Sequence, residues 1–214
     1  RITRFYGTDP GKVVVVPELI DLSSWRQGLA NAALSDGPPR ILCVAHLYPR
    51  KGIDTLLRAF AHLQRPAVLR IVGVGPEHDH LNHLVRGLGI TDRVQFLGYL
   101  PFDALTAEYR NATIFALPTT QEGFGIVFLE AMASSLPVIA GRAAAVPEVV
   151  SEGVTALLAG PNDEAELTNK HERLLDDPSR RAAMGAAGLQ RVQRYDAPVV
   201  ARQFLDAVGI SSPY

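Results

Sequence analysis

The stretch TIFALPTTQEGFGIVFLEAMASSLPVIA, residues 113–140, contains the clearest pattern of secondary structure in the sequence. Its apolar, β-branched beginning at 113–117 and its end at 137–140 are each typical of a short buried strand. Between them, residues 125–134 are apolar on nearly every side, as expected of a helix that lies in a core. Strand, helix and strand in this order predict a βαβ unit, whose two strands run parallel in one sheet.

The same alternation continues in both directions along the chain. Further strands are predicted at 40–45, 67–73, 93–97 and 154–158, and further helices at 53–64, 77–88, 102–110 and 147–151. We therefore predict an α/β protein with a Rossmann-like, doubly wound sheet of six parallel strands and helices on both faces. After the last strand, the sequence predicts a helical C-terminal tail at 163–177, 178–187 and 189–208.

Residues 1–36 do not follow this pattern. KVVVVPE at 12–18 is predicted as a strand, and the polar, glycine- and proline-containing sequence that follows it is predicted as a connector. We expect residues 1–36 to be the end of an otherwise missing N-terminal domain plus a linker, and residues 37–214 to form the ligand-binding domain.

Composition excludes several classes of protein. The 214 residues are 47% hydrophobic and 20% charged, which suits a large globular domain. The net charge of −1 indicates no nucleic-acid footprint and no polybasic membrane anchor. The single cysteine, Cys43, excludes a disulfide framework and a cysteine-based zinc site. No apolar run approaches the roughly 20 residues of a transmembrane helix, so we expect a cytoplasmic location, with a peripheral membrane role of the full-length protein left open.

Distinctive loops follow three of the predicted strands. HLYPRKG (46–52) follows the first strand, GVGP (73–76) the second and PTTQEGFG (118–125) the fourth. Open α/β sheets bind ligands at the carboxyl ends of their strands. We therefore expect these three loops to lie together and to form a binding site.

The residue types in these loops favour a phosphate or diphosphate. The first loop offers His46, Arg50 and Lys51 as cations, and the second offers Gly73 and Gly75, which let the backbone approach a ligand closely. The third loop opens a helix whose first N–H groups lack partners and suit an anion. These amides belong to Gly125, Ile126 and Val127.

Glu130 is a carboxylate inside this apolar helix. A buried ionised carboxylate is costly unless it is hydrogen-bonded. Its place one to two turns beyond the predicted anion site would let it accept hydrogen bonds from a pair of ribose hydroxyls. The sequence therefore predicts a nucleotide site.

Taken together, these motifs closely resemble the C-terminal half of GT-B-fold glycosyltransferases of the large group 1 family, the retaining enzymes of family 4. The resemblance covers about residues 12 to 208 and includes PRKG with IDTLLRAF, LRIVGVGPEHDHL, DRVQFLGYL and LPTTQEGFGIVFLEAMASSLPVIA. Its specific part is the pair Glu122 and Glu130, separated by seven residues and embedded in EGFG and LEAMA.

The resemblance implies a role for each matched position. Lys51, with His46 and Arg50 near it, would neutralise the diphosphate, Glu130 would hold the ribose, and Glu122 would lie against the donor sugar as the catalytic residue. The remaining donor-binding positions that it implies are Gly73, Gly75, Val94, Phe96, Leu97, Gly123, Phe124, Gly125, Ile126 and Val127, with 94–97 flanking the base. The implied activity is metal-independent hexosyl transfer without a cofactor from a UDP-, GDP- or ADP-sugar to an unknown acceptor. Because the acceptor domain is missing, the isolated chain would bind donor without transferring the sugar.

The sequence also departs from the family pattern. The family usually has Gly-Arg where this chain has Ala45 and His46, Asn-Gly-Val-Asp where it has ELID at 18–21, and Gly-Gly where it has alanines at 144–145. A histidine titrates near pH 6.5, so the first departure weakens the fixed positive charge at the diphosphate.

Other interpretations stay open. A GT-B-fold nucleotide-sugar epimerase or a non-enzymatic nucleotide-binding module would share the donor site, and Glu122 could simply complement a helix dipole. NAD binding is disfavoured because GVGP lacks the further glycine at position 78, which is His78. His78, His80 and His83 lie close in sequence, yet without cysteine they indicate a solvated helix face rather than zinc.

Overall fold

The computed structural model describes residues 2–210 and contains one sheet of six parallel strands. The strands are β1 (Arg40–Val44), β2 (Val68–Val72), β3 (Val94–Gly98), β4 (Ile114–Leu117), β5 (Val138–Gly141) and β6 (Ala156–Ala159), in the spatial order β3-β2-β1-β4-β5-β6. Each strand lies at the predicted position, within two residues, and the doubly wound fold is confirmed.

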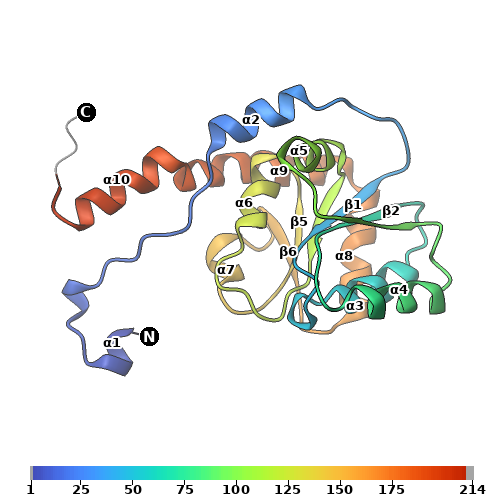
Figure 1. Cartoon of the computed structure of the whole chain (residues 1–214), viewed down its shortest axis with the longest axis horizontal. Coiled ribbons are helices and arrows are strands. Elements are labelled where there is room, and N and C mark those ends of the chain that lie inside the picture. Colours follow the sequence, from blue (N-terminus) through green and yellow to red (C-terminus); the bar gives the residue numbers. More distant parts are fainter. Residues whose placement is uncertain (1, 211–214) are drawn as a thin grey trace.

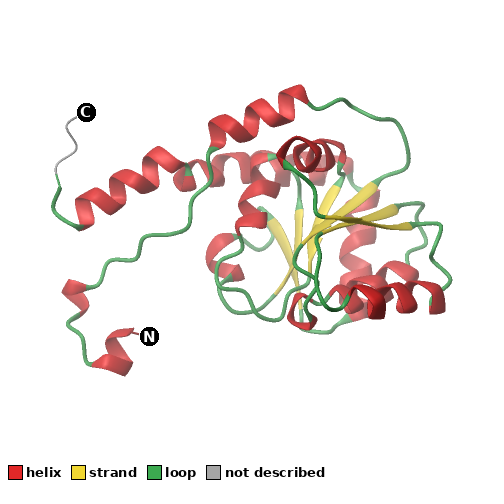
Figure 2. Ribbon diagram, viewed as in Figure 1, coloured by secondary structure: helices red, strands yellow, loops and turns green. Residues whose placement is uncertain are grey.

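Helices cover both faces of the sheet (Figures 1 and 2). On one face α5 (Phe102–Asn111) and α6 (Ile126–Ala133) carry α2 (Leu22–Asn31) outside them, and α9 (Pro178–Val192) packs on α6. On the other face α3 (Ile53–Ala61) lies between α4 (His78–Gly87) and α8 (Glu164–Asp176). The short α7 (Val146–Val149) joins β5 to β6. β4, β5 and β6 are buried throughout because both of their faces are covered.

The strand order reverses between β1 and β4, which are hydrogen-bonded neighbours although two strands separate them in the sequence. The chain winds outward from β1 through β2 to β3 and from β4 through β5 to β6. The crossover helices therefore leave a crevice at the carboxyl ends of β1 and β4, where open α/β sheets bind ligands.

The N-terminal segment differs from the prediction. A 3₁₀ turn, η1 (Pro10–Lys12), follows α1 (Ile2–Tyr6), but residues 13–19 are neither helix nor strand, so the strand predicted at 12–18 is wrong. The β-branched run of valines has no neighbouring strand to pair with, and a strand needs one.

The stretch predicted as a connector contains α2. Asp21 caps this helix by accepting a hydrogen bond from Ser24 N at 3.0 Å. Trp25 is only 4% exposed and packs edge-on against Tyr109 of α5. Residues 22–31 thus pack on the sheet domain, while the proposed boundary between residues 36 and 37 stays a prediction.

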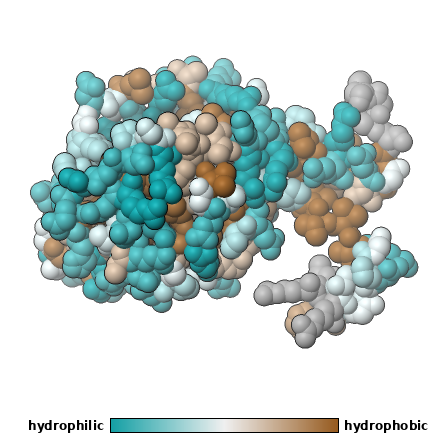
Figure 3. Space-filling view, turned by 180° about the vertical axis from the view of Figure 1, so that it is seen from behind, coloured by the Kyte–Doolittle hydropathy of each residue, from teal (hydrophilic) through white to brown (hydrophobic). Residues whose placement is uncertain are grey.

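The C-terminal tail is helical, as predicted. After α8 and α9, a 3₁₀ turn, η3 (Gln193–Tyr195), leads to α10 (Ala197–Ala207). Both α10 and the residues before α2 project from the sheet domain (Figure 1), and apolar side chains gather on this projecting part (Figure 3). They include Val15 and Phe204, which are 84% and 54% exposed. Within residues 2–210, none of the helices has the length and apolarity that crossing a bilayer requires.

Candidate functional site

The loops after β1 and β4 are bonded to each other at the crevice. The carbonyl oxygen of Arg50 accepts hydrogen bonds from Thr119 Oγ1 at 3.0 Å and from Thr120 N at 2.8 Å. Arg50 and Lys51, two of the three predicted cations, lie in η2 (Pro49–Lys51), between β1 and α3. The backbone therefore fixes the cation-bearing loop against the loop that opens α6.

A hollow of about 300 Å³ lies where these loops meet the start of α6. Gly125 begins the helix with φ +94°, and a Cβ there would lie 2.6 Å from the Phe128 ring, so only glycine fits without strain. No side chain caps the first amides of α6. The hollow is lined by Glu18, Val44, Ala45, His46, Lys51, Glu122, Phe124, Gly125, Ile126 and Val127.

Lys51 and Glu122 form an ion pair inside this hollow. Lys51 Nζ lies 2.6 Å from Glu122 Oε2, and the two side chains are only 13% and 12% exposed. Glu122 Oε1 also accepts a bond from Gly123 N at 3.3 Å. The predicted phosphate cation and the predicted catalytic carboxylate thus contact each other.

The other two predicted cations are placed differently. His46 lines the hollow, whereas Arg50 lies outside it with its guanidinium 4.9 Å from the centre of the Tyr48 ring. The fixed charge in the hollow therefore comes from Lys51.

A second, apolar hollow of about 250 Å³ adjoins the first and shares Val44, Ala45, His46 and Val127 with it. Its other lining residues are Val72, Gly73, Val74, Tyr99, Leu100 and Leu105. Gly73 has φ +133°, and a Cβ there would lie 1.9 Å from the carbonyl oxygen of Ala45. This close approach of two strand ends requires glycine. A flat apolar ring such as a nucleobase suits such a surface.

Seven of the predicted site residues line neither hollow, namely Arg50, Gly75, Val94, Phe96, Leu97, Gly123 and Glu130. Val94, Phe96 and Leu97 lie in β3, and the Phe96 ring packs against His78 at 5.6 Å. The residues just after this strand, Tyr99 and Leu100, line the apolar hollow instead. Gly75 packs against the backbone of Leu47, so it positions the second loop. No sequence pattern singles out Tyr99 or Leu100, because the end of β3 is set by its pairing with β2.

Glu130 has a protein partner that sequence reasoning missed. The hydroxyl of Tyr109 in α5 donates a hydrogen bond to Glu130 Oε2 at 2.7 Å. Burial raises the pKa of Glu130, and the bond from Tyr109 acts in the opposite direction. Burial first, and the nearby Glu130 charge second, raise the pKa of Tyr109 well above its usual value. The apolar helix therefore carries its carboxylate with one hydrogen bond from within the protein.

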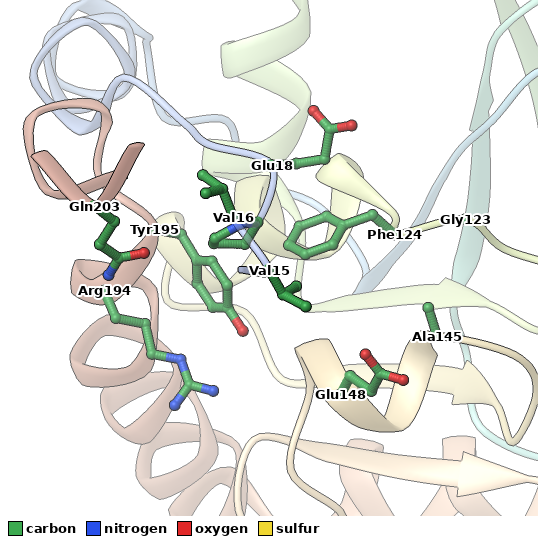
Figure 4. Close-up of a pocket in the computed structure, with 11 residues that line it drawn as sticks. Val15, Val16, Glu18, Gly123, Phe124, Ala145, Glu148, Arg194, Tyr195 and Gln203 are labelled. Atoms are coloured by element: carbon green, nitrogen blue, oxygen red, sulfur yellow. The ribbon is translucent and has the colours of Figure 1, made fainter. Parts of the chain in front are cut away.

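A third hollow, of about 770 Å³, lies beside the first and shares Glu18 and Phe124 with it. Gly123 also lines it, on the same loop. Figure 4 shows Arg194 and Gln203 on one side of this space and Glu148 on the other. Arg194 is the cation that lines this hollow, and none of the three predicted cations does so.

Metal ligands do not gather anywhere in the described part of the chain. Within residues 2–210 no group of three or more histidine, cysteine, aspartate or glutamate side chains could hold a metal ion. His78 and Asp79 at the start of α4 are exposed, as a solvated helix face predicts.

The fold and this crevice define a class: a Rossmann-like α/β domain with a polar and an apolar hollow at its topological switch point. The chain is similar in structure to sucrose-phosphate synthase of Thermosynechococcus elongatus, with a TM-score of 0.84 and 29% identity, matched over 97% of this chain and 55% of that chain. It is also similar to HepE of Anabaena in complex with UDP-glucose, with a TM-score of 0.74 and 26% identity, over 94% and 53% of the two chains.

The family model for "Glycosyl transferases group 1" matches residues 29–191. The chain therefore belongs to the group 1 glycosyltransferase family, as its motifs predict. It is 39% identical over 160 residues to the GDP-mannose-dependent α-(1-6)-phosphatidylinositol monomannoside mannosyltransferase of Mycolicibacterium smegmatis, covering 70% of this chain and 42% of that protein. It is 34% identical over 213 residues to D-inositol 3-phosphate glycosyltransferase 2 of Catenulispora acidiphila, covering 91% and 50%. The chain spans about half the length of these relatives.

Proposed function

We propose that this chain is the donor-binding half of a retaining, metal-independent glycosyltransferase that transfers a hexose from a nucleoside-diphosphate sugar. The observation that carries the proposal is the meeting of Lys51 with the uncapped start of α6 at the switch point, next to an apolar hollow. A cation and free helix amides suit a diphosphate, and the apolar hollow suits a base.

The geometry supports one orientation of the donor. The base would lie in the apolar hollow by Gly73 and Tyr99, and the diphosphate between Lys51 and the amides of α6. Glu130, beyond Val127, would accept from the ribose. The sugar would then lie by Glu122, whose carboxylate stabilises positive charge at the anomeric carbon. Lys51 and the helix amides would take the role that a metal ion has in other diphosphate chemistry.

GDP-mannose is the donor we propose to test first. Relatives that are 39% identical to this chain carry the name GDP-mannose-dependent mannosyltransferase. The UDP-glucose complex of HepE, at 26% identity, makes UDP-glucose the natural comparison. The acceptor would bind against a further half of the enzyme, which orients it on the anomeric carbon.

Thermal unfolding of the chain in the presence of GDP-mannose, UDP-glucose and an ADP-sugar, with EDTA added, tests this proposal. A donor at 100 times its dissociation constant should stabilise the fold by about 2.7 kcal/mol. Lys51→Ala should abolish most of this gain. The matched control is Lys170→Ala, because Lys170 also pairs with a glutamate at 2.6 Å and is 12% exposed, but lies on α8 away from the crevice. Absence of stabilisation by every donor would contradict the proposal.

Glu130→Ala tests the ribose contact. If the carboxylate accepts ribose hydroxyls, the variant should bind GDP more weakly by about 1.5–3 kcal/mol, as for a hydrogen bond to a charged group. Wild-type protein should lose a similar amount with 2′-deoxy-GDP, and the variant little more. Equal losses for ribose and deoxyribose ligands in calorimetric titrations would show that Glu130 is structural.

A further inference from the structure

Tyr109 is a buried tyrosine whose hydroxyl group contacts Glu130, the carboxylate that is predicted to bind the ribose. It lies in α5, with 0% of its surface exposed, and it donates to Glu130 Oε2 at 2.7 Å. The same hydroxyl lies 3.5 Å from the carbonyl oxygen of Val127. Val127 lines both the polar and the apolar hollow, so this contact reaches the underside of the crevice.

Neighbouring rings hold Tyr109 in place. The Trp25 ring packs edge-on at 5.2 Å, and the Phe115 ring is stacked at 5.8 Å. Trp25 Nε1 also donates to Ser134 Oγ at 2.9 Å, and Ser134 Oγ donates to the carbonyl oxygen of Glu130 at 2.8 Å. Trp25 of α2 therefore packs against Tyr109, which is the donor, and is bonded through Ser134 to the turn of α6 that carries Glu130, the acceptor.

The second carboxylate oxygen of Glu130 remains open. Among the residues that the structure describes, the only buried side-chain nitrogen or oxygen without a hydrogen bond is His171 Nε2. Glu130 Oε1 receives no bond from α5, α6 or α2 and is therefore not sealed in the core. One oxygen is fixed, and the other is available to a ligand.

We propose that Tyr109 is a positioning residue of the ribose site: its hydroxyl holds Oε2 of Glu130 so that Oε1 faces the ribose hydroxyls. This role of Tyr109 rests on the proposed donor-binding function and deepens it. Tyr109 is fully buried, so it would act through Glu130 rather than on the ligand itself. A fixed acceptor lowers the conformational cost of binding. The bond also favours the ionised carboxylate, the form that can accept from both hydroxyls.

The groups that can titrate around Glu130 are few. Tyr109 faces it from α5, and Cys43 of β1 lies near Tyr109. Burial raises the pKa of Cys43 to about 12, so the thiol stays neutral. His46 lines both hollows. Because every variant below retains His46, differences between variants report Glu130.

The test compares Tyr109→Phe with Tyr195→Phe in calorimetric titrations at pH 8. The control removes a hydroxyl from another buried tyrosine, 5% exposed, which contacts Phe124 rather than Glu130. Tyr109→Phe should weaken GDP binding roughly threefold to tenfold, the range of one hydrogen bond. It should weaken 2′-deoxy-GDP binding much less, and Tyr195→Phe should change neither. In a Glu130→Ala background, Tyr109→Phe should have no further effect.

The pH dependence of GDP-mannose affinity distinguishes a positioning role of Tyr109 from a purely structural one. GDP-mannose affinity should fall as Glu130 is protonated, and loss of the Tyr109 bond raises the pKa of Glu130 further. The fall should therefore begin at higher pH in Tyr109→Phe than in the wild type. An unchanged profile and affinity, or an equal loss in the Glu130→Ala background, would overturn the proposal. Wild-type protein that binds neither GDP nor GDP-mannose would overturn the donor-binding function as well.

A second measurement serves if Tyr109→Phe does not fold. Protein grown on 3-fluorotyrosine keeps the ring packing and carries a more acidic hydroxyl, which donates a stronger hydrogen bond. Its loss of GDP-mannose affinity should begin at lower pH than in the wild type. A coincident profile would overturn the role of Tyr109.

Discussion

Glu122→Gln separates the two partners of the ion pair in the crevice. Lys51 Nζ and Glu122 Oε2 lie 2.6 Å apart, and with 13% and 12% of the side chains exposed, both charges are largely withdrawn from water. Glutamine keeps the shape and can still accept from Gly123 N, but Lys51 is left with an uncompensated charge. A charge-assisted hydrogen bond at such a site contributes about 1.5–3 kcal/mol. We expect the free energy of unfolding to fall by about 1–3 kcal/mol, or about 2–4 °C in Tm for each kcal/mol.

A bound diphosphate should repair this loss. If the diphosphate replaces Glu122 as the partner of Lys51, saturating GDP-mannose should stabilise Glu122→Gln more than the wild type. Urea unfolding with and without GDP-mannose measures both quantities. The control is Glu152→Gln, whose pair with Arg142 is 44–49% exposed. Its loss should stay below about 1 kcal/mol and be the same with and without ligand. An equal loss for Glu122→Gln with and without GDP-mannose would refute the competition for Lys51.

Three further predictions concern single positions. Burial lowers the pKa of His171 from 6.5 to about 4, so the folded protein holds His171 in its neutral form. The free energy of unfolding should therefore fall by up to about 3 kcal/mol from pH 6.5 to 4, because His171 takes up a proton more readily in the unfolded chain. Urea titrations should show a shallower fall for His171→Phe. His46→Arg places a permanent charge at the diphosphate and should tighten GDP-mannose binding at pH 8 about fivefold in calorimetry, and equal affinities would remove His46 from the site. Gly73→Ala would place a Cβ 1.9 Å from a carbonyl oxygen and should lower the free energy of unfolding by at least about 2 kcal/mol, whereas Gly87→Ala, in a helix with open space around it, should raise it by up to about 1 kcal/mol.

The fold could be predicted from the sequence because the strands are short, mainly apolar runs, most of them between glycine- or proline-containing loops. The 12–18 stretch has the same local signal, yet it forms no strand. A strand is stabilised by a neighbour, and local sequence does not say whether one is present. The helix at 22–31 was missed for the converse reason. Its largest apolar residue, Trp25, gains its burial partly from Phe102 and Tyr109, far along the chain.

The polar part of the site could be predicted because its residues cluster in loops after strands. His46, Lys51 and Glu122 line one hollow, as their loops indicate. Tyr99 and Leu100, which line the apolar hollow, could not be singled out from the sequence, because the exact end of β3 depends on its pairing with β2 rather than on residue type. That 94–97 flank the base stays a prediction. Tyr109 could not be found either, since a tyrosine in an amphipathic helix is usually an ordinary core residue. Only the three-dimensional contact with Glu130 distinguishes it.

A crystal structure of the chain with GDP-mannose would show directly where the donor binds. We expect the diphosphate between Lys51 and the first amides of α6, the base in the apolar hollow beside Tyr99, and the ribose hydroxyls on Glu130. We also expect Lys51 to have left Glu122 for the diphosphate. Nucleotide bound in the hollow of Arg194 and Glu148, or at the switch point with its diphosphate away from Lys51, would contradict the proposed donor site.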